Sequence, residues 1–227
     1  MKKNTIIKII LLVASTLSAM CTGVISPAIP LIAKDYHEIE NIKMILKMLV
    51  VLPNLFIAIT SPIAGYAASR VKNKKYILCG GLLMYGAFGT AGFYIQDIKI
   101  ILLSRVFVGI SIAFITTSAT AMIVEYFIDP KERSSVISMQ TTTMSIGSVL
   151  YTMISGIVAD VHWRNIFLIY SIALILMPFA LLFLTSSNPE SKTSEEESDI
   201  FQNQFILQNN YLIFAICCIN VVIMTMF

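Results

Sequence analysis

A few large polar side chains interrupt the apolar stretches of this chain, and they are the residues best placed to do chemistry. Arg105, Asn54 and Gln140 carry polar heads that need partners where water is scarce. A charged group inside such a stretch is a functional candidate by default, because stranding it in lipid is costly. Arg105 lies about 7 Å in from Ile100, where its stretch begins. Its guanidinium therefore either faces a central cavity or extends back to the outer interface, and we favour the cavity.

Hydroxyl side chains at helical spacing form a second polar feature. Residues three or four apart share one face of a helix, so such a series marks a face turned away from lipid. Small hydroxyl residues also let membrane helices pack closely without a ligand, and packing alone is the better explanation of the longer series. One series runs from Arg105 through Gly109, Thr116 and Thr120, and the longer one comprises Ser138, Thr141, Thr142, Ser145, Ser148, Thr152 and Ser155.

Residue types that usually carry catalysis or bind metals are sparse. The two histidines, His37 and His162, are far apart, so no histidine–cysteine zinc site is expected. All four cysteines lie in apolar stretches and imply no disulfide framework. No Ser/His/Asp set or carboxylate pair is spaced for chemistry, so we expect neither an enzyme nor a cofactor. The net charge of +3 is small and its lysines flank apolar runs, which argues against nucleic-acid binding.

The elements that must position the polar groups are membrane-spanning helices. Of the 227 residues, 57% are hydrophobic and only 13% are charged, and the mean hydropathy is +0.82, far above that of a soluble domain. A hydrocarbon core needs roughly 20 apolar residues in a helix, and these runs are too long for barrel strands. We predict an all-α membrane protein whose glycine-rich third span is a packing helix. The predicted spans are Ile6–Ile32, Met44–Ala67, Tyr76–Ile95, Ile100–Val124, Ser135–Val158, Ile166–Leu184 and Tyr211–Phe227.

Positive charges in the short loops predict the orientation. Lysine and arginine near the ends of spans are retained on the cytoplasmic side. With the N-terminus inside, that side collects ten such residues and the opposite side five, and the loop Arg70–Lys75 alone carries four. We therefore expect a multi-pass protein of the inner (plasma) membrane of the cell, with a cytoplasmic N-terminus.

The composition changes sharply after the sixth span. Residues 185–199 include Pro189 and the run Glu195–Glu197, and this segment is too polar to cross a membrane. We predict a six-helix transmembrane bundle over 1–185, an acidic cytoplasmic linker over 186–210 and the start of a seventh span over 211–227. That last run has about 17 residues, the lower limit for a span. We expect the seventh helix to be truncated and a second half of the protein to be missing.

The loop after the second span carries a motif of glycine and positive charge. A pattern G-x-L-a-D-r-x-G-r-k fits at Gly65, Arg70 and Lys74. Ser69 stands where the pattern has an acidic residue, and Lys72 where it has a second glycine. Part of any charge network that uses this acidic position must therefore be missing or rebuilt elsewhere.

Further motifs lie in the fourth, fifth and sixth spans. Arg105 and Gly109 form an R-x-x-x-G motif, and Trp163–Phe167 forms a W-R-x-x-F motif at the start of the sixth span. Gly147 and Gly156 match a glycine-rich motif of the fifth span. Together with the layout of six spans, an inner loop and a seventh span, these motifs resemble the major facilitator superfamily, more particularly its drug-efflux-like branch. Tyr151-Thr152 stands where that branch usually has Gly-Pro.

This resemblance implies the N-terminal half of a secondary transporter that works by alternating access, with export of amphipathic compounds the expected activity. In the family, spans one, two, four and five line the central passage and the loop after span two latches the two halves. The resemblance thus assigns substrate-cavity candidates, gating-loop residues and helix-packing glycines. The cavity candidates are Asn54, Arg105, Thr116, Gln140, Thr141 and Ser145, the gating residues are Gly65, Arg70 and Lys74, and the packing glycines are Gly109, Gly147 and Gly156.

The expected partners are the lipid bilayer, a small-molecule substrate and either a second six-helix half or another copy of the chain. Coupling to protons is left open, because none of the thirteen acidic residues lies centrally in a predicted span. Two alternatives remain. One is an inactive truncated fragment, and the other is a membrane interaction protein that acts through its acidic loop.

Overall fold

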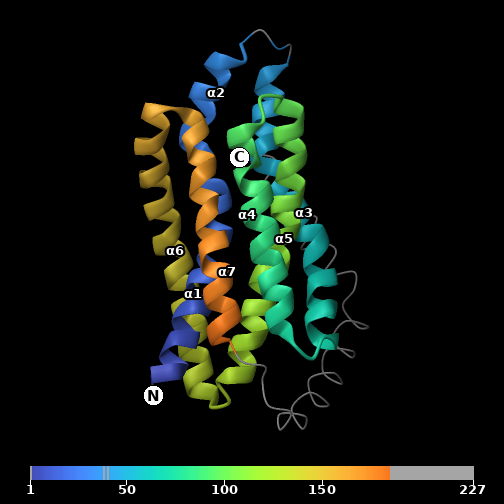
Figure 1. Ribbon diagram of the computed structural model, residues 1–227, viewed down its shortest axis with the longest axis vertical. Coiled ribbons are helices and arrows are strands. Elements are labelled where there is room, and N and C mark those ends of the chain that lie inside the picture. The colour runs from blue at the N-terminus through green and yellow to red at the C-terminus, as the bar shows by residue number, and fades with distance from the viewer. Residues whose placement is uncertain (1, 38, 40, 185–227) are drawn as a thin grey trace. The chain divides into compact units, whose positions relative to one another are not determined.

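The computed structural model describes residues 2–37, 39 and 41–184, and Figure 1 shows their helices running side by side. Within that part of the chain there is no strand, and six helical segments are long and apolar enough to cross a membrane. The predicted fold class, an all-α membrane protein with a six-helix bundle, is confirmed. The predicted acidic linker and the predicted seventh span, 211–227, lie outside the described residues.

The first span contains a break. Its three parts are α1 (Lys2–Gly23), the 3-10 turn η1 (Ser26–Ala28) and α2 (Ile29–Asp35). Pro27 and Pro30 lie in the first turns of η1 and α2, where a residue without an N–H is tolerated. The predicted span Ile6–Ile32 is therefore not one continuous helix, although Thr5–Asp35 as a whole is long enough to cross.

The other five spans begin before the predicted apolar runs. They are α3 (Ile42–Arg70), α4 (Lys74–Tyr94), α5 (Ile98–Tyr126), α6 (Pro130–Val161), and η2 (Trp163–Ser171) leading into α7 (Ile172–Phe183). Polar caps explain the extra residues at two of the starts. Asp129 accepts a hydrogen bond of 3.1 Å from the backbone N–H of Glu132, so α6 begins at Pro130 instead of Ser135. Asp97 caps α5 in the same way through the N–H of Lys99.

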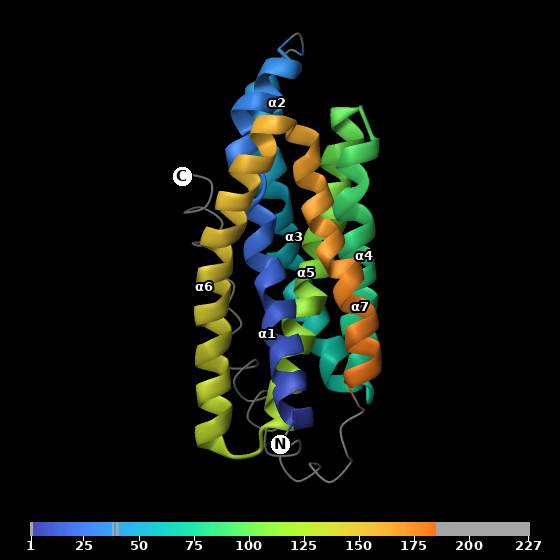
Figure 2. The same cartoon turned by 60° about the vertical axis from the view of Figure 1, so that its left-hand side comes forward.

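The spans pack around two neighbouring helices. α5 contacts α3, α4 and α1, while α1 packs most extensively on α6, which Figure 2 shows along the edge of the group. Apolar side chains with no exposed surface fill the space between them. They include Leu11, Leu17, Leu82, Ile115 and Ile166. Because lipid is as apolar as leucine, close packing and buried polar contacts hold such helices together.

Glycines on one face of α4 let the sixth span approach closely. A Cβ built at Gly89 would lie 2.6 Å from the side chain of Tyr170, and one at Gly92 would lie 2.4 Å from that of Phe167. Both distances are shorter than any real Cβ contact, so only glycine fits without movement of the neighbour. This approach brings two aromatic rings into the centre of the bundle, where they meet α5.

Candidate functional site

Gln140 joins three spans through its side-chain amide. Its Nε2 donates to the hydroxyl of Ser15 in α1, at 2.8 Å, and to that of Thr120 in α5, at 3.1 Å. Gln140 and Ser15 are both buried. A hydrogen-bonded junction of this kind satisfies polar groups that lipid would leave unpaired. Of the cavity candidates named from the sequence, Gln140 is the one whose hydrogen bonds within the described residues reach other helices.

The remaining hydroxyl candidates bond within their own helices. Thr116 donates to the carbonyl of Ile112 at 2.9 Å and is partly buried. Thr141 and Ser145 are exposed, and each donates to a carbonyl in the preceding turn of α6. Asn54, in α3, is partly buried and likewise donates from Nδ2 to the carbonyl of Val50 at 3.0 Å. These four residues therefore need no partner helix, and each keeps oxygen lone pairs for another group.

Further polar contacts continue along the seam between α1 and α6. The hydroxyls of Thr16 and Tyr151 lie 3.0 Å apart, and Ser155 donates to the carbonyl of Val24. Val24 lies in the break of the first span, where its carbonyl has left the regular helix. Sequence reasoning missed Ser15 and Thr16. The spacing of Ser15, Ser18 and Thr22 on one face of α1 was the available signal for Ser15.

Arg105 is enclosed by aromatic rings. It has no exposed surface, and its guanidinium carbon lies 4.8 Å from the ring centre of Phe167 and 5.0 Å from that of Tyr170. Its three guanidinium nitrogens have no hydrogen-bond partner among the described residues. Cation–π attraction compensates part of the cost of burying the charge. In this structure the side chain neither extends to the outer interface nor lines an open cavity.

The same region holds α1 through backbone carbonyls. Tyr85 of α4 donates to the carbonyl of Leu17 at 2.9 Å, and Tyr170 of η2 donates to that of Cys21 at 3.3 Å. α1 ends at Gly23, so the carbonyl of Cys21 belongs to the last turn, whose acceptors lack helical partners. Both tyrosines lie in apolar runs, and no sequence pattern distinguished them as functional.

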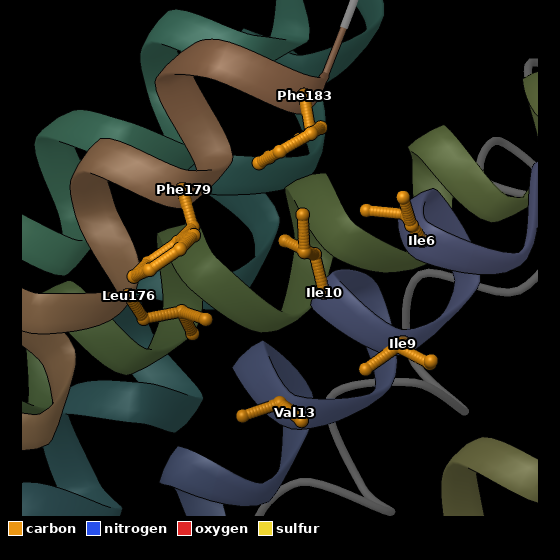
Figure 3. A pocket seen from close by; sticks show the side chains of 7 residues that line it. All are labelled: Ile6, Ile9, Ile10, Val13, Leu176, Phe179 and Phe183. Carbon is orange, nitrogen blue, oxygen red and sulfur yellow. The ribbon is translucent and has the colours of Figure 1, made fainter. Parts of the chain in front are cut away.

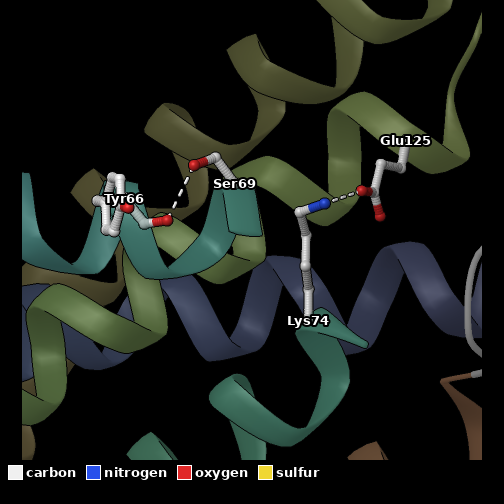
Figure 4. A network of polar contacts seen from close by, with 4 residues as sticks. All are labelled: Tyr66, Ser69, Lys74 and Glu125. Atoms are coloured by element: carbon white, nitrogen blue, oxygen red, sulfur yellow. Dashed lines mark hydrogen bonds and ion pairs between the residues drawn. The ribbon is translucent and has the colours of Figure 1, made fainter. Parts of the chain in front are cut away.

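An ion pair joins α4 to α5 next to the short connection between α3 and α4. Lys74, at the start of α4, pairs with Glu125, near the end of α5, and both side chains are largely shielded from solvent (Figure 4). Ser69 donates to the carbonyl of Tyr66 at 2.8 Å, and Arg70 lies over the Tyr66 ring at 5.4 Å. The acidic partner in this network is thus Glu125 of α5. The position of the motif that is usually acidic is occupied by Ser69, which lies in α3.

The glycines named as packing residues differ in their surroundings. A Cβ at Gly109 would lie 2.5 Å from the carbonyl oxygen of Pro53, and one at Gly147 would lie 3.2 Å from Thr16. Gly156 and Gly65, which was predicted in the loop but lies in α3, have no such neighbour, because an added Cβ would find no described atom within 4 Å. Gly147 and Gly156 are nine residues apart, which puts them on opposite faces of α6. The expected packing role of Gly156 therefore has no support in the described contacts.

An apolar groove lies between α1 and α7, away from the polar junction. It has a volume of about 230 Å³ and is lined by isoleucine, valine, leucine and phenylalanine side chains alone. Figure 3 shows this lining, which offers no group that could orient a polar ligand. The lining residues are Ile6, Ile9, Ile10, Val13, Leu176, Phe179 and Phe183.

Known proteins are similar to this chain in sequence. The chain is 27% identical over 201 residues to Multidrug resistance protein 1 of Bacillus subtilis, covering 87% of this chain and 49% of that protein. It is 26% identical over 148 residues to Protein spinster homolog 1 of Homo sapiens, covering 63% of this chain and 27% of that protein. The chain thus spans about half, or less, of the length of these curated relatives.

Solved structures of transporters have the same arrangement of helices. A bacterial homologue of the human lysosomal transporter spinster, in an inward-facing and unoccupied conformation, aligns with a TM-score of 0.70 at 17% identity, over 82% of this chain and 44% of the other. A peptide transporter, POT, aligns with a TM-score of 0.58 at 13% identity, over 97% and 46%. The sequence model of the Major Facilitator Superfamily matches residues 11–227. The chain therefore belongs to the Major Facilitator Superfamily.

Proposed function

We propose that this chain forms one bundle of a secondary transporter that moves a small molecule across the membrane by alternating access. The observation that carries the proposal is the Gln140 junction, a hydrogen-bonded polar centre that links α1, α5 and α6 inside a bundle of six spans. Membership of the superfamily and similarity to named transporters support the same activity. They point to a transporter rather than an enzyme.

We propose export of amphipathic compounds as the direction and substrate class. Similarity to a protein named for multidrug resistance supports this choice. The polar junction and the surrounding apolar side chains suit a molecule that has both a polar group and an apolar body. Coupling to protons is left open, because the described spans have no carboxylate near their centres.

We propose that a second six-helix half, or another copy of the chain, completes the transport pathway. Thr141 and Ser145 are exposed on α6, although that helix is long enough to span the membrane. Their remaining lone pairs are better satisfied by water or a partner bundle than by lipid. The proposed location is the inner membrane with a cytoplasmic N-terminus, which the distribution of positive charge supports.

Dye efflux tests the proposal. The full chain is expressed alone and together with a second six-helix half, and efflux of rhodamine 6G, a fluorescent amphipathic cation, is followed in cells lacking their own exporters. We expect efflux above background when the second half is present, and efflux from the chain alone would identify another copy of the chain as the partner. Arg105→Ala in the active pair is expected to slow efflux, because Arg105 fixes two aromatic residues of the sixth span against α5. No efflux from the pair at any expression level would contradict the proposed activity.

A further inference from the structure

We infer that the transport site recognises hydrogen-bond donors, such as the N–H of a substituted amine, through the side-chain oxygen of Gln140. This inference rests on the proposed function and names its substrate class more closely. It follows from three features of the described residues. They are the orientation of the Gln140 amide, the acceptor oxygen that this orientation leaves without a partner, and the hydroxyls of α5 and α6 that donate within their own helices.

The orientation of the Gln140 amide is fixed by Ser15. The Ser15 hydroxyl donates its proton to the carbonyl of Leu11 at 2.9 Å, and a carbonyl can only accept. The lone pairs of the Ser15 oxygen must therefore face a donor, which is Nε2 of Gln140 at 2.8 Å. A flipped amide would set two acceptors against each other. The second N–H of Nε2 is directed to Thr120, so both amide protons are used.

This arrangement leaves Oε1 of Gln140 as an acceptor without a partner. No hydrogen bond from the described residues reaches it. Nor is it sealed inside the protein, because the buried side-chain atoms that lack a partner all belong to Arg105 in the described part of the chain. A carbonyl oxygen that is not fully enclosed and is held in one direction by two neighbouring helices is a preorganised recognition group.

Three further hydroxyls on α5 and α6 use their protons within their own helices and present only lone pairs to other groups. Thr141 follows Gln140 in α6, Ser145 lies one turn further along, and Thr116 lies one turn from Thr120 in α5. Each of these hydroxyls donates to a carbonyl of its own helix. The cation of Arg105 is enclosed by its aromatic neighbours and is not offered to a ligand. Toward any further group these three hydroxyls and Oε1 of Gln140 act as acceptors, and a complementary substrate brings donors.

A pair of dyes tests the inference on binding alone. Rhodamine 6G carries secondary amine N–H groups, whereas tetramethylrhodamine ethyl ester has the same charge, ring system and ester but no N–H. Binding of each dye to the full chain in lipid nanodiscs is measured by fluorescence anisotropy. One neutral hydrogen bond corresponds to a preference of roughly five-fold for rhodamine 6G. Gln140→Met keeps the length of the side chain but removes the acceptor, so it should abolish this preference.

Two further variants separate recognition from folding. Ser15→Ala frees the amide to rotate, so the preference should fall to about half or less of its original ratio while the protein stays folded. Thr90→Val is the matched control, because Thr90 of α4 bonds only to carbonyls in its own preceding turn, and it should keep the full preference. If Gln140→Met fails to fold, Ser15→Ala serves as the test. A preference for rhodamine 6G that is unchanged in Ser15→Ala would overturn the inference.

The outcomes also distinguish the inference from the proposed function. Equal affinity of the native chain for the two dyes, or a preference that survives Gln140→Met, overturns donor recognition and leaves transport intact. Absence of binding to both dyes, together with absence of efflux from the paired halves, contradicts the transport proposal itself and the inference with it.

Discussion

The guanidinium carbon of Arg105 lies 4.8 Å from the centre of the Phe167 ring, in a position with no access to solvent. The close approach of α4 to η2 at Gly92 sets the position of this ring, so the arginine is held by helices that precede and follow its own. Burying an ion without a hydrogen-bonded partner costs more than one aromatic face returns. The arrangement is therefore unfavourable for stability in the conformation described.

We predict that Arg105→Met stabilises the bundle. The thioether fills a similar volume and removes a buried charge, so the free energy of unfolding should rise by about 1–4 kcal/mol. Thermal unfolding of the purified chain in one detergent measures the effect. Arg70→Met is the control, since Arg70 is exposed over Tyr66 and should change stability by less than about 0.5 kcal/mol. A lower unfolding temperature for Arg105→Met would show that the buried guanidinium stabilises the fold.

A charge exchange tests the Lys74–Glu125 pair. Lys74→Glu alone places like charges together where solvent is largely excluded, and should destabilise the chain by about 1–3 kcal/mol. Glu125→Lys alone should do the same. The double exchange restores opposite charges and should recover at least half of the loss. A double-mutant cycle on thermal unfolding gives the coupling, and purely additive losses would show that the pair contributes nothing.

The sequence predicted the spanning helices well because a hydrocarbon core imposes a length and an apolar composition on each of them. Their ends were less predictable. The extension of α6 to Pro130 depends on the Asp129 cap, and the break in the first span depends on how Pro27 and Pro30 are accommodated. A hydropathy pattern carries no information about caps or 3-10 turns.

The site was predictable only in its residue types. Gln140 was identified because a large amide in an apolar run needs a partner. The pattern could not name its partners, which are Ser15, 125 residues away, and Thr120 on the preceding helix. The same limit applies to Arg105, whose aromatic neighbours depend on the packing of η2. Spacing within one helix defines a face, and only the tertiary structure defines what that face meets.

Substitution of Gly109 tests the contact between α3 and α5. A Cβ there would lie 2.5 Å from the backbone oxygen of Pro53, which cannot move without shifting α3, so Gly109→Ala should destabilise the chain by about 1–3 kcal/mol. Gly65→Ala is the matched control, because its Cβ meets no described atom within 4 Å and alanine favours the helix. We expect Gly65→Ala to leave the unfolding temperature unchanged or slightly higher. Equal losses in both variants would argue against a close contact at Gly109.

Labelling on the two sides of α4 tests the orientation. α4 has 21 residues, about 32 Å of helix, so the loops at its ends must lie on opposite faces of the membrane if it spans. Lys72 and Gln96 are exposed in these loops. In a background with all four native cysteines replaced, we predict that a membrane-impermeant maleimide labels Gln96→Cys in intact cells but labels Lys72→Cys only after permeabilisation. The reverse result would mean that the bundle has the opposite orientation in the membrane. Labelling of both positions in intact cells would mean that α4 does not cross the membrane, which would contradict a transporter of this fold.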